Sequence, residues 1–212
     1  MLYTNNYKRK LVKDDYNVVA DLFAEASTDL ETYKNHIDMF VSKLNGKKVL
    51  DVACGAGLAT AYLTGLGLEA TGLDFAENLI NIARANHPDT NYVAADICKY
   101  KTKEKFDGIF TKNALFHLPD RDLKKVLKKF YNILNNGGRL CVILDIPKEA
   151  GEQILVEPLD NRYKLYYNYL QPQKVETLLT IAGFTIENKI IEADSDYVYA
   201  SGVMVFQAYK QV

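Results

Sequence analysis

Residues 49–60 of the chain read VLDVACGAGLAT. An apolar run typical of a buried strand leads into Gly55 and Gly57, and a helix-forming segment follows directly. Glycine tolerates positive φ angles and lets the backbone approach a ligand closely. The free N–H groups at the start of a helix favour a carboxylate or a phosphate. The stretch therefore predicts a strand–turn–helix unit with a ligand bound against the turn.

Acidic residues accompany three successive predicted strands. Asp51 lies inside the first strand, Asp74 ends the second, and Asp96 ends the third. Because a carboxylate accepts hydrogen bonds, Asp74 suits the two hydroxyls of a ribose and Asp96 suits the exocyclic amine of adenine. Asp51 would repel a pyrophosphate but could hold an ammonium group or brace the N–H groups of the loop. Ligands of open parallel sheets bind at the carboxyl ends of the strands, so the three acids indicate one site.

Short apolar runs alternate with amphipathic segments from residue 48 to residue 146. This order predicts an α/β fold of right-handed βαβ units, with a mostly parallel sheet and helices on both faces. The expected strands are Lys48–Ala53, Leu68–Leu73, Asn91–Ala95, Gly108–Thr111 and Arg139–Ile146, and the expected helices are Leu58–Leu66, Ala76–Asn86 and Asp120–Leu134.

The two ends of the chain have other patterns. Apolar residues at three- and four-residue spacing predict two N-terminal helices, one near Tyr16–Phe23 and one over Leu30–Leu44. Residues 147–168 look like a loop. After them come a helix over Pro172–Ala182, strands over Phe184–Glu192 and Val198–Tyr209, and a polar turn at Ala193–Asp196 that would join the two strands in an antiparallel hairpin.

The glycine loop, the acid ending the second strand and the Ala-Asp-Ile that ends the third resemble the class I S-adenosylmethionine-dependent methyltransferases. The likeness runs over residues 48–146, and the closing hairpin extends it. It implies a Rossmann-like sheet of seven strands in the order 3-2-1-4-5-7-6, with strand seven antiparallel. It also implies a single domain over residues 1–212, in which residues 1–46 form a helical cap and residues 147–170 are an acceptor-side insertion.

This resemblance implies that S-adenosylmethionine is the methyl donor and S-adenosylhomocysteine the product. Gly55 and Gly57 would flank the methionine moiety, Asp74 would hold the ribose, and Asp96 with the backbone of Ile97 would read adenine. A tyrosine of the N-terminal region often reaches the donor in relatives, which suggests Tyr7 or Tyr16. The other expected donor-site residues are Asp51, Ala53, Ala56, Lys112, Asn113 and Phe75, with Phe75 against the adenine ring.

The fourth strand and its loop, residues 106–119, read FDGIFTKNALFHLP. This is similar to the branch of the family that acts on small molecules, and it lacks the Asn-Pro-Pro-aromatic motif of enzymes that methylate DNA bases. His117 could be a general base, because its ordinary pKa lies near neutral pH, or it could bond the loop backbone. The tyrosine-rich run at 162–169, which includes the catalytic candidate Tyr169, could cover the acceptor or be an ordinary half-buried segment.

Composition limits the other partners that we expect. The net charge is -1 and the pI is about 6.3, so no overall field attracts nucleic acid, and we expect none as a partner. The three cysteines form no CxxC pair, which argues against a disulfide framework and a metal site. No apolar run is long enough for a membrane span, and residues 1–13 lack a signal-peptide core. We expect a cytoplasmic monomer or homodimer that binds a small-molecule acceptor.

Two other functions compete with methyl transfer. A nicotinamide-dependent oxidoreductase could also use Asp74 on a ribose, but its fingerprint needs a third glycine where this chain has Thr60. A protein that binds S-adenosylmethionine without catalysing transfer would keep every donor-side feature. The sequence of the acceptor side does not separate that second alternative from an enzyme.

Overall fold

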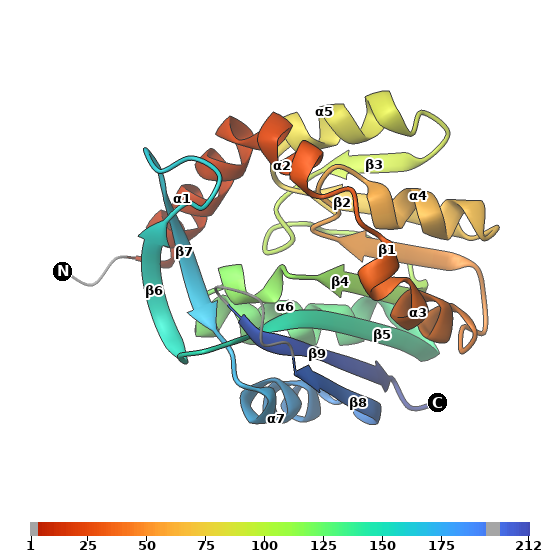
Figure 1. Ribbon diagram of the computed structural model, residues 1–212. Coiled ribbons are helices and arrows are strands. Elements are labelled where there is room, and N and C mark those ends of the chain that lie inside the picture. Colours follow the sequence, from red (N-terminus) through yellow and green to blue (C-terminus); the bar gives the residue numbers. More distant parts are fainter. Residues whose placement is uncertain (1–3, 194–199) are drawn as a thin grey trace.

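The computed structural model describes residues 4–193 and 200–212. Its centre is a seven-stranded sheet in the order β3-β2-β1-β4-β5-β9-β8 (Figure 1). Neighbouring strands pair in parallel from β3 through β5, and β9 pairs antiparallel with both β5 and β8. The strands are β1 (Lys48–Val52), β2 (Glu69–Asp74), β3 (Asn91–Ala94), β4 (Phe106–Lys112), β5 (Leu134–Pro147), β8 (Thr185–Ala193) and β9 (Ala200–Tyr209).

Helices cover both faces of this sheet. Buried side chains of α6 and α7 pack on one face and those of α3 and α4 on the other, in two separate apolar clusters. The residues at the centre of the sheet, such as Leu50 and Ile109, are fully buried, as strands covered on both faces require. The helices are α1 (Asn5–Val18), α2 (Ala20–Ala26), α3 (Glu31–Val41), α4 (Leu58–Gly65), α5 (Glu77–Asn86), η1 (Leu115–His117), α6 (Asp120–Ile133) and α7 (Pro172–Ala182).

The strand order confirms the predicted sheet. In both, the order reverses beside the first strand, and the next-to-last place belongs to the single strand that runs against the others. The β1–β2 register pairs Asp51 with Gly72 and Val52 with Leu73, so Asp51 and Asp74 come to the same edge of the sheet. The loops after β1, β2, β3 and β4 meet at that edge, and this places the site.

The prediction of a loop over residues 147–168 was wrong. That segment contains β6 (Gly151–Val156) and β7 (Lys164–Tyr169), which pair as an antiparallel hairpin outside the main sheet. Strand β7 is buried on both of its faces, because α1 packs on one side and the loop after β4 on the other. Its sequence therefore lacks the alternation of apolar and polar residues that identifies a half-buried strand.

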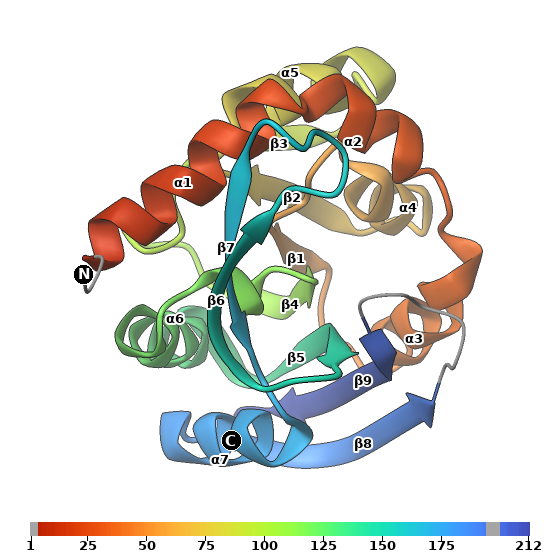
Figure 2. The ribbon, with the colours of Figure 1, turned by 60° about the vertical axis from the view of Figure 1, so that its left-hand side comes forward.

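The N-terminal prediction was incomplete. Among the described residues, three helices are present before β1 instead of two, and the first begins at Asn5, well before the stretch near Tyr16–Phe23 that predicted a helix. Thr4 caps this helix, since its side chain accepts a hydrogen bond from the N–H of Tyr7. Helices α1 and α2 and the β6–β7 hairpin arch over the carboxyl edge of the sheet (Figure 2). The polar turn expected at 193–196 lies, apart from Ala193, outside the described residues.

Candidate active site

The glycine loop turns its backbone toward the strand ends. Gly55 and Gly57 have φ angles of 54° and 88°, and Ala53 has 58°. A Cβ on Gly57 would stand 2.4 Å from the hydroxyl oxygen of Tyr92, so only glycine fits. At the start of the loop the N–H of Ala53 donates to the carbonyl of Leu73 at 2.7 Å, which ties the loop to β2. The loop is therefore held rigidly in a shape that needs glycine.

Asp74 joins the loop to the next helix. One of its carboxylate oxygens accepts from the N–H of Gly55 at 3.0 Å, and the other accepts from the N–H of Ala76 at 2.8 Å. Burial raises the pKa of Asp74, and these two N–H groups partly offset the shift. Ala76 makes no side-chain cap for α5, so the carboxylate of Asp74 binds the N–H there instead.

Asp51 is buried beside the loop and bound by the first helix after it. The hydroxyl of Thr60 donates to its carboxylate at 2.6 Å. Burial raises the pKa of Asp51 to about 7, against the opposing effect of the Thr60 bond. Thr60 stands where a dinucleotide-binding fingerprint has its third glycine. The residue that departs from that fingerprint is thus the one that supports Asp51.

Asp96 has an unexpected partner. The guanidinium of Arg9, from α1, donates to its carboxylate at 3.1 Å, and the N–H of Cys98 donates to it at 2.8 Å. Arg9 also lies 3.4 Å from a carboxylate oxygen of Asp122. The N-terminal helix is therefore tied to the end of β3 by charge. No sequence pattern indicated Arg9, because it is 87 residues away from Asp96 in the chain.

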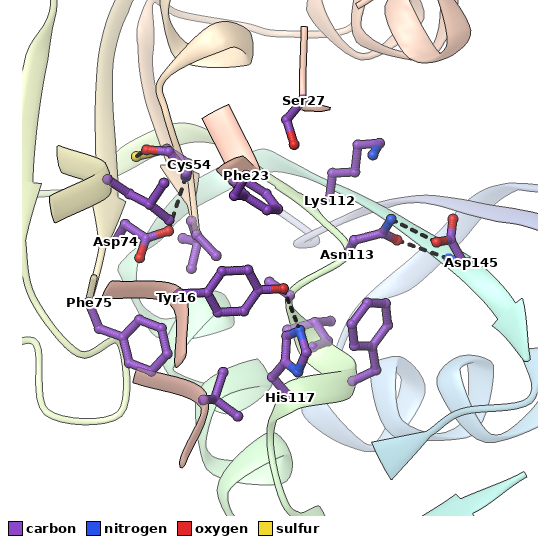
Figure 3. A pocket seen from close by; sticks show the side chains of 18 of the residues that line it. Tyr16, Phe23, Ser27, Cys54, Asp74, Phe75, Lys112, Asn113, His117 and Asp145 are labelled. Carbon is purple, nitrogen blue, oxygen red and sulfur yellow. Dashed lines mark hydrogen bonds between the residues drawn. The ribbon is translucent and has the colours of Figure 1, made fainter. Parts of the chain in front are cut away.

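One pocket of about 520 Å³ brings the predicted residues together. All of the predicted site residues line it except Gly57 and the alternative tyrosine Tyr7. Gly57 lies behind the loop, against Tyr92. Figure 3 shows Asp74 and Phe75 at one end, Tyr16 and His117 in the middle, and Lys112 and Asp145 beyond them. Lining residues that sequence reasoning missed include Arg9, Val12, Phe23, Ser27, Asp29, Tyr33 and Asp145.

The end of β4 contributes a polar corner. Asn113 has a φ of 51° and exchanges two hydrogen bonds with Asp145, each 3.0 Å long: its amide donates to the carboxylate and its oxygen accepts from the backbone N–H. The ammonium of Lys112 lies 4.8 Å from the ring centre of Tyr33. Burial lowers the pKa of Lys112, while the charges of Asp145 and Asp29 oppose that shift.

His117 is fixed by both of its ring nitrogens. Nδ1 lies 2.9 Å from the carbonyl oxygen of Tyr166, and Nε2 lies 3.0 Å from the hydroxyl of Tyr16. A carbonyl can only accept, so Nδ1 carries the proton and Nε2 of the neutral ring accepts from Tyr16. Burial lowers the pKa of His117 to about 4, which keeps the ring neutral at physiological pH. His117 thereby joins β7 to α1. His36, in α3, is buried as well.

Aromatic rings surround this histidine. Tyr167 lies 5.1 Å and Phe116 4.6 Å from the His117 ring, centre to centre, and Tyr16 packs edge-on to it at 5.5 Å. Tyr167 also stacks on Tyr169 with the ring planes 18° apart and the centres 5.0 Å apart. Beside the polar corner, this part of the pocket is thus walled by aromatic rings.

In the described part of the chain, no group of three or more His, Cys, Asp or Glu side chains is arranged to hold a metal ion. Within the same residues, no helix is both long and apolar enough to cross a membrane. The acids of the site are spread along the pocket and accept hydrogen bonds from N–H and O–H groups of the protein.

The sheet order and the loop define the class I methyltransferase fold, and comparisons with known proteins agree. Residues 49–138 match the model of the methyltransferase domain family. An uncharacterised methyltransferase of Synechocystis sp. is 30% identical over 170 residues, covering 77% of this chain and 76% of the relative. A ubiquinone biosynthesis O-methyltransferase of Nitrosococcus oceani is 26% identical over 174 residues, covering 75% and 70%.

Solved structures show the same fold. The 1,6-didemethyltoxoflavin-N1-methyltransferase of Burkholderia thailandensis superposes with a TM-score of 0.79 at 17% identity, over 100% of this chain and 92% of that one. The magnesium protoporphyrin IX methyltransferase of Synechocystis gives a TM-score of 0.74 at 16% identity, over 96% and 97%. The chain belongs to the class I S-adenosylmethionine-dependent methyltransferases.

Proposed function

We propose that this enzyme transfers the methyl group of S-adenosylmethionine to an oxygen or nitrogen nucleophile of a small-molecule acceptor. The observation that carries the proposal is one continuous pocket. It joins the glycine loop and the three strand-end acids to an aromatic chamber roofed by α1 and the β6–β7 hairpin. A donor and an acceptor could therefore lie end to end in the same pocket, beneath α1 and the hairpin.

The residues of the strand ends fit an adenosyl group. Asp74 already binds two N–H groups, yet each carboxylate oxygen has a second lone pair for a ribose hydroxyl. Phe75 lines the same end of the pocket and offers a ring face to adenine, beside Asp96 and Ile97. Gly55 faces the space where the methionine part would lie. A Cβ added at this position would come within 3.1 Å of the ring of Phe23, which lines the same pocket.

The polar corner at the end of β4 suits the charged end of the donor. An amino acid carries an ammonium and a carboxylate group, and the corner offers both kinds of partner. The carboxylate of Asp51 and the ammonium of Lys112 both line the pocket. We assign Asp51, with the backbone of Ala53 and Ala56, to the ammonium group of the donor. We assign Lys112, with Asn113, to its carboxylate group.

Bound S-adenosylmethionine supplies an activated sulfonium methyl group, so the protein mainly has to align the acceptor. Positioning of that kind contributes roughly 7–11 kcal/mol to lowering a barrier. Aromatic walls such as Tyr167 and Tyr169 would hold a flat acceptor against the donor and exclude water. The pair formed by Tyr16 and His117 lies where the two ligands would meet (Figure 3).

We assign His117 to positioning and not to proton transfer. A general base works best when its pKa is near the operating pH, whereas burial holds the pKa of His117 near 4. Its Nε2 is also occupied by the Tyr16 hydroxyl. The ring thus keeps Tyr16 and the hairpin in register over the acceptor, and the hydroxyl of Tyr16 is the group of this pair that can meet the acceptor.

The acceptor class is supported by the named relatives. One is an O-methyltransferase of ubiquinone biosynthesis, and another acts on a nitrogen of 1,6-didemethyltoxoflavin. Their names leave the choice between oxygen and nitrogen open, and the walls of this pocket favour a flat ring in either case.

Calorimetry with S-adenosylhomocysteine and with NADH tests the donor, and transfer of a labelled methyl group into a metabolite extract tests the reaction. In the calorimetry we expect S-adenosylhomocysteine to bind at one site and NADH not to bind. In the labelling experiment we expect a labelled small molecule to form. Binding of the product without any labelled compound across broad extracts would favour a non-catalytic donor-binding protein. Binding of NADH alone would favour an oxidoreductase.

A further inference from the structure

Helix α1 carries a buried carboxylate outside the pocket. Asp15 is 2% exposed, and neither of its oxygens has a hydrogen-bond partner. The preceding residue, Asp14, is exposed and pairs with Lys10 one turn earlier. A buried carboxylate without a partner is costly when it is ionised. Asp15 therefore needs a proton or a cation in this structure.

No cation from the neighbouring elements meets this need. The charged groups that act on Asp15 are Glu157 and Asp160, both acidic and both in the turn between β6 and β7. On α1 itself, Lys8 pairs with Glu152 and Arg9 pairs with Asp96 and Asp122.

The other groups that face this part of α1 are neutral or already paired. Asn17 bonds Asn78 of α5, and the neighbouring Tyr16 bonds the neutral ring of His117. In the turn itself, Arg162 is paired with Asp160. Among the described residues, Asp15 and Glu157 therefore have no balancing positive charge.

Glu157 is the second buried member of the pair. It is 4% exposed, and one of its oxygens accepts from the N–H groups of Leu159 and Asp160, which shapes the hairpin turn. Those N–H bonds favour the ionised form of Glu157, so the proton between the two residues belongs on Asp15. A proton on Asp15 removes the buried charge without the need for any other partner.

We propose that Asp15 is a proton-dependent latch that holds α1 against the β6–β7 hairpin. It lies on the face of α1 that packs against β7 through Val12 and Tyr16. The latch is closed while Asp15 is protonated, and it loosens when that proton leaves to the solvent. Both elements line the pocket, α1 through Arg9, Val12 and Tyr16 and the hairpin through Tyr167 and Tyr169. Their separation would open the site for exchange of ligands, whatever the acceptor is.

The direction of the pH effect follows from linkage. In the closed state burial and the two acidic neighbours raise the pKa of Asp15 to about 7, whereas an opened, solvated Asp15 returns toward its ordinary value near 4. Closing therefore takes up a proton between those values. The equilibrium constant for closing falls by about ten-fold between pH 6 and pH 8, and it no longer changes with pH above that range.

Amide hydrogen exchange along α1, corrected for the intrinsic effect of pH, measures the latch without any ligand. We expect the protection of residues 9–18 to fall by about ten-fold from pH 6 to pH 8 in the unmodified protein. Asp15→Asn, which resembles the protonated form, should keep high protection at both pH values. Asp14→Asn is the matched control and should behave as the unmodified chain does.

The same pH dependence in Asp15→Asn as in the unmodified protein would overturn the latch. If Asp15→Asn does not fold, Asp15→Ala replaces it, because that variant also removes the titrating group, and a pH dependence equal to that of the unmodified protein has the same meaning. Release of S-adenosylhomocysteine, followed by stopped flow, gives the functional consequence. The pKa of Asp51 is also raised to about 7, so only the difference between Asp15→Asn and the unmodified enzyme is assigned to the latch. We expect release at pH 8 to be faster in the unmodified enzyme than in Asp15→Asn. Equal release rates in the two proteins at pH 8 would also contradict it. Failure to bind this ligand would sink the proposed function but leave the exchange result standing.

Discussion

The floor and the roof of the pocket are built in different ways. The floor is the carboxyl edge of the sheet, where consecutive residues of one strand–turn–helix unit form the glycine loop and bind each other across short distances. The roof is made from α1 and the β6–β7 hairpin, which are about 150 residues apart in the chain. They are joined through His117 of the loop after β4, whose ring bonds Tyr16 on one side and the carbonyl of Tyr166 on the other. A rigid floor suits one invariant donor, and a roof of separate pieces suits a variable acceptor and ligand exchange.

The largest effect is expected from the floor. Gly57→Ala places a Cβ against the Tyr92 hydroxyl at a φ of 88°, so it should destabilise the fold by about 2–4 kcal/mol. Gly65→Ala at the end of α4 is the control, because nothing lies within 4 Å of its added Cβ, and it should be neutral or stabilising by up to about 1 kcal/mol. Urea unfolding measures both. Equal stability of the two variants would show that the loop is not rigid.

His117 gives the next largest effect, because its ring bonds both elements of the roof, α1 and β7. Its pKa falls from the ordinary 6.5 to about 4 in the folded chain, so the unfolded chain takes up a proton that the folded chain refuses. Stability is therefore lost as the pH falls from about 6.5 to 4, by about 2 kcal/mol between pH 7 and pH 5.

His117→Gln should remove that loss from the profile of unfolding free energy against pH. The raised pKa values of Asp15 and Asp51 act in the opposite direction, and they are common to both proteins. The difference between the two profiles therefore isolates His117. Parallel profiles would mean that the ring is not held neutral by burial.

Asp74→Asn tests the floor as a donor site. The amide keeps one accepting oxygen but loses the charge, and we expect affinity for S-adenosylhomocysteine to fall about ten-fold. Glu69→Gln, at the exposed start of the same strand, is the control and should bind as the unmodified enzyme does. Calorimetry decides the matter. An unchanged affinity in Asp74→Asn would put the ribose elsewhere.

The smallest effect is expected at the outer wall of the roof. Tyr169→Leu removes the ring stacked on Tyr167, which should raise the KM of the acceptor about three- to ten-fold while the KM of the donor stays unchanged. Tyr163→Leu, outside the lining of the pocket, should leave both values unchanged. The measurement is steady-state methyl transfer to whichever acceptor the labelling experiment identifies. A matching rise in the donor KM would show that the two ligand spaces are not separate.

The same contrast explains what the sequence could predict. The floor follows from short motifs at the ends of successive strands. The glycine loop, Asp51, Asp74 and Asp96 all lie at the expected edge of the sheet. The roof depends on contacts across long stretches of chain, such as the hydrogen bond between Tyr16 and His117, which are 101 residues apart.

The roof elements also lacked the periodic patterns that identify strands and helices. β7 is buried on both faces, which removes the alternation of a strand, and α1 is a polar helix with a narrow apolar stripe. Thr4 as a cap and the Pro-Leu-Asp-Asn turn at 158–161 were the local signals that could have indicated them. Arg9 and Asp145 joined the site through contacts that no spacing reveals.

The central claim is that the floor of this pocket holds the adenosyl donor. A crystal structure of the enzyme with S-adenosylhomocysteine tests it most directly. We expect the ribose hydroxyls at hydrogen-bonding distance from Asp74, about 2.5–3.0 Å, with the adenine ring against Phe75 and the homocysteine chain over Gly55. Density for the ligand anywhere else, or a ribose turned away from Asp74, would contradict the account.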